Sequence, residues 1–75
     1  MNVSDVTIHV NERLDSQARS SLEEDMRQVD GVIAPRFSPG HEHLMIVAFN
    51  PDRVQASVLL HRVQASGYRA QLVNA

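Results

Sequence analysis

The stretch FSPGHEHLMIVAF, residues 37–49, contains a turn and a strand that decide how the rest of the chain can be arranged. Its Ser-Pro-Gly segment is typical of a tight turn, and HLMIVAF (43–49) is apolar on both alternations, which indicates a central strand. The segment before the turn, VIAPRF (32–37), predicts a short strand at a sheet edge, because Pro35 has no N–H to donate to a neighbouring strand. We therefore expect an antiparallel hairpin in the middle of the chain.

A helix and an outer strand are expected on each side of this hairpin. Val6, Ile8 and Val10 alternate with more polar residues, as in a half-buried strand. Apolar residues at spacings of four, four and three predict the first helix, and a Leu-Val pair four residues apart predicts the second. The flanking elements are a strand over residues 3–10, a helix that starts at Asp15 or Ser16 and ends at Gly31, a helix opened by NPD (50–52) and closed by Gly67, and a strand over 68–73.

The expected order of elements is β-α-β-β-α-β, with one tight hairpin at its centre. Each β-α-β crossover is expected to be right-handed. This order predicts a ferredoxin-like α+β sandwich, in which a four-stranded antiparallel sheet carries both helices on one face. A chain of 75 residues with no evident linker or repeat is expected to form a single domain over residues 1–75.

The composition excludes several classes of site. The chain has no cysteine, so a disulfide, a thiolate metal site and a thiol nucleophile are all excluded. All seven basic residues are arginine and the net charge is -2, which argues against nucleic-acid binding. No apolar run is long enough for a transmembrane helix and no signal peptide is recognisable, so we expect no membrane association and a cytoplasmic location.

No arrangement of residues predicts catalysis. A Ser-His-Asp combination cannot be assigned, because the serines have ordinary helix-surface or turn explanations. The acidic run Glu23, Glu24 and Asp25 lies on the polar face of a helix, where charged side chains are usually solvated. We therefore expect that the protein is not an enzyme.

Three segments of the chain together resemble a known family. They are LDSQARSSLEEDMRQVDGV (14–32), IVAFNPDRV (46–54) and GYRAQLV (67–73). In their order and spacing, these segments resemble the heavy-metal-associated domain of copper chaperones and of the N-terminal tails of metal-pumping ATPases. The resemblance covers nearly the whole chain and implies a ferredoxin-like fold.

The resemblance also implies a position for the metal site, after the first strand. Members of the family carry soft metal ions between two cysteines in a CxxC motif. Counted back from the Gly-Val pair that follows the first helix, the two positions fall on Asp15 and Ala18, so both thiolates are absent. The family's Gly-Tyr pair is kept as Gly67 and Tyr68. Carriage of monovalent copper between thiolates therefore does not transfer to this chain.

Three histidines and one carboxylate are expected at the same end of the sheet. His9 lies near the end of the first strand, His41 and His43 lie beside the hairpin turn, and Asp15 lies in the loop that follows the first strand. Imidazole and carboxylate groups suit zinc, nickel or divalent copper. We therefore predict a cysteine-free metal site formed by His9, His41, His43 and Asp15, with the identity of the ion left open.

This metal site depends on which residues of the third strand face the helices. If Met45, Val47 and Phe49 form the core, strict alternation places His9 and His43 on opposite faces of the sheet. A bulge or a one-residue slip in the hairpin would reverse that conclusion. The alternative interpretation is that the turn histidines are simply solvated.

The face of the sheet without helices is a second candidate site. Leu44, Ile46 and Ala48 form an apolar row that would point outward if the other alternation is buried. Such a row is typical of a contact surface for a protein partner or for a second copy of the chain. The sequence thus supports two functions: a small soluble metal-handling domain with a degenerate site, or a protein-interaction module that kept the fold and lost metal binding.

Overall fold

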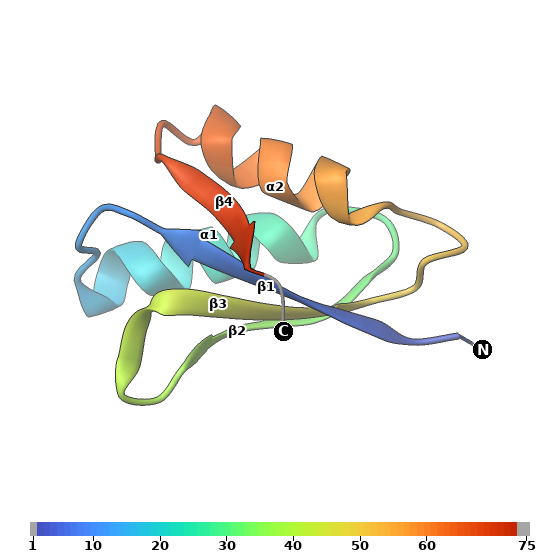
Figure 1. Ribbon diagram of the computed structural model, residues 1–75, viewed down its shortest axis with the longest axis horizontal. Coiled ribbons are helices and arrows are strands. Elements are labelled where there is room, and N and C mark those ends of the chain that lie inside the picture. The colour runs from blue at the N-terminus through green and yellow to red at the C-terminus, as the bar shows by residue number, and fades with distance from the viewer. Residues whose placement is uncertain (1, 74–75) are drawn as a thin grey trace.

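The computed structural model describes residues 2–73 and confirms the predicted order of elements. Four antiparallel strands form one sheet in the order β2-β3-β1-β4, and two helices pack on one side of it (Figure 1). This is the expected ferredoxin-like arrangement. The elements are β1 (Ser4–Val10), α1 (Ser16–Arg27), β2 (Val32–Ser38), β3 (His41–Phe49), α2 (Ala56–Ala65) and β4 (Ala70–Val73).

Helix α1 begins at a side-chain cap and is followed by a glycine turn. The carboxylate of Asp15 accepts a hydrogen bond of 2.7 Å from the backbone N–H of Ala18, which satisfies one of the unpaired donors at the helix start. The chain then turns at Gly31, whose φ of +102° suits glycine, and a Cβ there would lie 2.8 Å from Cγ1 of Val54. Only glycine therefore fits at position 31, just before β2.

Several boundaries differ from those predicted. Helix α1 ends at Arg27, with Gln28 as its C-cap, rather than at Gly31. The NPD segment does not open α2, because Asn50 Oδ1 accepts a hydrogen bond of 2.9 Å from the N–H of Asp52 and holds these residues in a turn. Helix α2 begins later, at Ala56, and β4 begins at Ala70 rather than at residue 68.

The core lies between the sheet and the two helices. In β3, Met45, Val47 and Phe49 are buried, and the alternate residues of the strand are only partly buried. Ile8 of β1 pairs with Met45, so both strands turn the same alternation toward the helices. The helix that covers β2 is α1, and α2 covers the β4 side. The helices contribute Leu22, Met26, Leu59 and Val63 to the same cluster.

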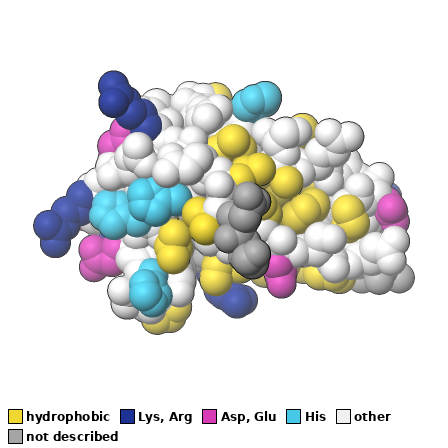
Figure 2. Space-filling view, viewed as in Figure 1, with side chains coloured by type: hydrophobic (Ala, Val, Ile, Leu, Met, Phe, Trp, Pro, Cys, Tyr) yellow, Lys and Arg dark blue, Asp and Glu magenta, His cyan; other side chains and the backbone are white. Residues whose placement is uncertain are grey.

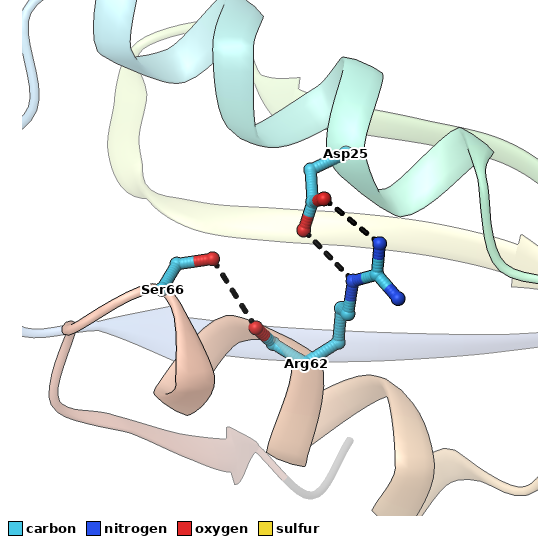
Figure 3. Close-up of polar contacts among 3 residues, drawn as sticks. All are labelled: Asp25, Arg62 and Ser66. Atoms are coloured by element: carbon cyan, nitrogen blue, oxygen red, sulfur yellow. Dashed lines mark hydrogen bonds and ion pairs between the residues drawn. The ribbon is translucent and has the colours of Figure 1, made fainter.

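The two helices are joined by an ion pair on the outer side of the core. The guanidinium of Arg62 in α2 donates two hydrogen bonds of 2.9 Å to the carboxylate of Asp25 in α1 (Figure 3). These bonds hold the pKa of Asp25 below its ordinary value. The hydroxyl of Ser66 donates a bond of 3.3 Å to the backbone carbonyl of Arg62, one turn before the end of the helix (Figure 3).

Candidate metal site at the histidine pair

His9 lies on the face of the sheet that the helices leave uncovered, which is called here the open face. In the central strand β1 it pairs with Leu44 of β3 on one side and with Gln71 of β4 on the other. Its neighbours in sequence, Ile8 and Val10, are fully buried on the opposite face. Alternation along β1 therefore directs the imidazole of His9 away from the core.

The ring of His43 stacks on the ring of His9. The two ring centroids are 5.6 Å apart and the ring planes differ by 15°. Met45 is buried against the helices, so strict alternation along β3 would direct the side chain of His43 to the covered face. The structure instead brings both imidazoles together.

A register shift in the hairpin accounts for this departure from alternation. Phe37 of β2 pairs with Met45 of β3, whereas the next residue of β2, Ser38, pairs with His41. Residues 42–44 of β3 therefore have no partner in β2, because Phe37 and Ser38, which pair on either side of them, are consecutive. Extra residues on one strand bend it and redirect its side chains. The bulge that the sequence left as an alternative is present, and it frees His43 to reach His9.

A hydrogen bond fixes the orientation of His43. Its Nδ1 lies 2.8 Å from the backbone carbonyl oxygen of Val10. Because a carbonyl oxygen can only accept, Nδ1 carries the hydrogen and donates it, and Nε2 of the neutral ring carries the free lone pair. Histidines that bind metals usually donate their other ring N–H in this way, which orients the ring and raises its basicity.

His9 has a similar but more exposed partner. Its Nδ1 lies 3.1 Å from Oδ1 of Asn11, and Nε2 of Gln71 lies 3.5 Å from the same nitrogen. The shorter contact, to an oxygen that accepts, favours the tautomer with the hydrogen of His9 on Nδ1 and the lone pair on Nε2, whereas the longer contact to Gln71 favours the opposite one. Both rings of the pair can therefore present an unprotonated Nε2 to a ligand.

The hairpin tip adds further polar groups beside the pair. A hollow of about 460 Å³ opens there, lined by His9, Gly40, His41, Glu42, His43 and Leu44. Figure 2 shows histidine side chains gathered at the hairpin end of the molecule, next to hydrophobic side chains. His41 and Glu42 are exposed, so their side chains are free to move in solvent. Across residues 2–73, no group of three or more histidine, aspartate or glutamate side chains is placed to hold an ion.

Asp15, the fourth residue of the predicted metal site, lies at the start of α1. Its carboxylate caps α1, so one oxygen is already engaged by the N–H of Ala18. Ala18 packs partly buried against the core, and Tyr68 lies with it beside a separate hollow of about 120 Å³ between α1 and the turn that follows α2. His61, in α2, is exposed and does not line the hairpin hollow. The structure thus brings His9 and His43 together, with His41 near them.

The open face is apolar along β3. Leu44, Ile46 and Ala48 are partly buried there, and β4, on the other side of β1, adds Val73, which is 40% exposed. Val73 pairs with Thr7 of β1, so it belongs to the open face. The structure therefore places the row predicted from sequence beside the histidine pair, on a surface without helices.

Sequence reasoning missed the groups that orient the histidines. The carbonyl of Val10 is a backbone atom, and every residue has one, so no residue type marks it. Asn11 directly follows β1 and offered a detectable signal, since a polar residue two positions after a strand histidine can reach that ring. Gln71 could be found only once β4 was placed beside β1.

Comparison with known proteins identifies the fold. No protein-family model and no curated protein sequence matches the chain. Among solved structures, oxidized MerP from Ralstonia metallidurans is 16% identical, with a TM-score of 0.84 and coverage of 97% of this chain and 100% of that one. A copper-binding domain from the P-type ATPase HMA7 is 17% identical, with a TM-score of 0.83 and 93% of each chain covered.

A third structure extends the same comparison. The N-terminal domain of a potential copper-translocating P-type ATPase from Bacillus subtilis, in its Cu(I)-loaded state, is 18% identical, with a TM-score of 0.83 and coverage of 95% of this chain and 88% of that one. These neighbours are heavy-metal-associated domains. The chain has their fold, and its sequence lacks the cysteines of a CxxC motif.

Proposed function

We propose that this chain is a small metal-handling domain that binds a divalent transition-metal ion through Nε2 of His9 and His43. The observation that carries the proposal is the 2.8 Å hydrogen bond from His43 Nδ1 to the carbonyl of Val10, because it fixes the tautomer that leaves Nε2 unprotonated. The likeness to solved metal-binding domains supports the same class of function. His41 lines the same hollow from the hairpin tip, and Asp15 acts as a helix cap.

The chemistry of the donors selects the kind of ion. Imidazole nitrogen suits zinc, nickel and divalent copper, whereas monovalent copper favours the thiolates that this sequence lacks. An imidazole lone pair lies in the plane of its ring, so two rings inclined by only 15° must tilt before both face one ion. His43 is held by a backbone carbonyl, so His9, whose partner is the exposed side chain of Asn11, makes this adjustment.

The proposal includes the setting in which the ion is handled. Residues 1–75 act as one soluble, non-catalytic domain in the cytoplasm, and the partner is a protein rather than nucleic acid, given the net charge of -2. No helix within residues 2–73 is long and apolar enough to cross a membrane. The open face supports contact with another protein as a second function, because Val73 and Ile46 lie there without a covering helix.

The test is a titration of the apo protein with zinc, nickel and divalent copper, followed by two-dimensional proton–nitrogen NMR. We expect saturable changes at His9, His43 and their neighbours, complete by one equivalent of ion or less. The His43→Ala variant should lose these changes, and His61→Ala, which removes an exposed histidine on α2, should keep them. If all four histidines respond weakly and alike, or none responds, the proposed function is wrong.

A further inference from the structure

We propose that the bound ion joins two copies of this chain through their open faces, with His9 and His43 of each copy as its ligands. This inference rests on the proposed function, because it requires that the histidine pair binds an ion. It goes further in naming the partner, which is a second copy of the same chain, and in making the ion the condition for assembly.

The first argument is that one copy provides too few donors. Zinc in a closed protein site takes four ligands in a tetrahedral arrangement. Within the described part of the chain, the stacked pair supplies two imidazoles and no cluster of three ligand side chains exists. A second copy brings an identical pair, which completes four nitrogen ligands.

The second argument is the position of the pair on the molecule. His9 lies in β1 between β3 and β4, so its ring projects from the surface of the sheet and not from a deep cleft. A second copy can therefore approach this surface directly. A two-fold axis through the ion would relate the copies, and it would place the same patch of each against the other.

The third argument is the apolar surface beside the pair. Leu44 pairs with His9 across the sheet, Ile46 lies two residues further along β3, and Val73 lies two residues from Gln71 on β4. All three belong to the open face, which the helices do not cover. Contact between two open faces would remove these side chains from water at the same time as the ion is bound. The ion and the apolar contacts would then stabilise the same dimer.

A competing arrangement keeps the ion within one chain. His41 lines the same hollow and is exposed, so a movement of the hairpin tip could bring it to the ion as a third ligand. The two arrangements differ in stoichiometry, because a shared ion gives one ion for two chains and an unshared ion gives one for each. They also differ in which variant abolishes binding.

The test combines sedimentation velocity with calorimetric titration of zinc, using the whole chain at micromolar concentration. With EDTA present we expect a monomer, and with zinc we expect a dimer that contains one ion for two chains. His43→Ala should abolish both ion binding and dimer formation, whereas His41→Ala should leave both in place. Circular dichroism of each variant verifies that it is folded.

A pair of charge variants tests whether the open face forms the contact. Ile46→Glu places a charged carboxylate within the apolar contact surface of each copy in the proposed dimer and should weaken zinc-dependent association by about tenfold or more. Val58→Glu is the matched control, because Val58 is 46% exposed on α2, on the covered side of the sheet, and this variant should associate like the wild type.

The outcomes separate the two proposals. A monomer that binds one zinc ion for each chain and loses it in His41→Ala would overturn the shared site while leaving the proposed function standing. A dimer that is equally stable in Ile46→Glu and in the wild type would overturn the open face as its contact surface. Absence of any zinc binding in the wild type would overturn both proposals.

Discussion

The two faces of the sheet are built from alternate residues of the same strands and have different properties. On the covered face, Ile8 and Met45 are completely buried, and every buried side chain in residues 2–73 is non-polar. On the open face, one residue further along each strand, His9 and Ile46 remain accessible. A difference of one residue in sequence thus separates positions that stabilise the fold from positions that are free to bind.

This division explains how a site can change while the fold is kept. Substitutions on the covered face alter packing, which costs stability because protein interiors are close-packed. Substitutions on the open face alter contacts with solvent or with a partner and leave the core intact. The histidine pair therefore lies where it can vary without unfolding the chain.

The largest expected effect is a contrast between Met45→Ala and Ile46→Ala. Met45 is fully buried, so its truncation leaves a cavity and should lower the free energy of unfolding by about 2–5 kcal/mol. Ile46 is on the open face, and its truncation should cost about 1 kcal/mol or less. Urea unfolding followed by circular dichroism measures both. Equal losses would mean that the two faces do not differ as described.

A smaller effect is expected at the start of α1, one of the two helices that cover the sheet. Asp15→Ala removes the cap of α1 and should lower the free energy of unfolding by about 1 kcal/mol. Asp15→Ser keeps a capping oxygen and should restore most of this loss. Zinc binding should be the same in both variants and in the wild type. A parallel loss of zinc affinity in Asp15→Ala would instead return this carboxylate to the metal site.

The smallest effect is expected at the ion pair between the two covering helices, and it depends on pH. Because Arg62 holds the folded pKa of Asp25 below its ordinary 3.8, the charge of Asp25 stabilises the fold at pH values above that ordinary value. This contribution is lost as the pH falls through the lower folded pKa. Asp25→Asn should therefore be slightly less stable than the wild type at neutral pH, and the difference should shrink as the pH falls below the ordinary pKa of Asp25.

Salt provides the control for this last comparison. Both side chains of the pair are more than one third exposed, so added salt should screen the attraction and reduce the difference between Asp25→Asn and the wild type. Thermal unfolding at several pH values and two salt concentrations measures this difference in stability between Asp25→Asn and the wild type. A difference that does not change with pH would attribute the effect to packing and not to charge.

The fold could be predicted from the sequence because each of its signals is local. The alternation in β1, the cap at Asp15 and the turn at Gly31 each depend on a few neighbouring residues, and the structure contains all three. The start of α2 was misplaced because Asn50 can either cap a helix or close a turn, and here it closes a turn. The residues around Asn50 do not show whether its side chain caps a helix or closes a turn.

The candidate site was less predictable because it depends on pairing between distant strands. β3 is apolar on both alternations, so its pattern cannot tell which side faces the helices. The stacking of His43 on His9 depends on a register shift that the turn sequence does not reveal. The proximity of the histidines was inferred from topology, but their orientation required the positions of Val10 and Asn11.

Pro35 limits how this sheet could grow by adding strands from other molecules. It lies in β2, at one end of the strand order, and prolines in edge strands direct their missing N–H away from the sheet. That edge is consequently a poor template for a further strand, which leaves β4, of only four residues, at the other end. Edge-to-edge polymerisation needs two receptive edges on every molecule, so Pro35 disfavours growth of this sheet into fibrils.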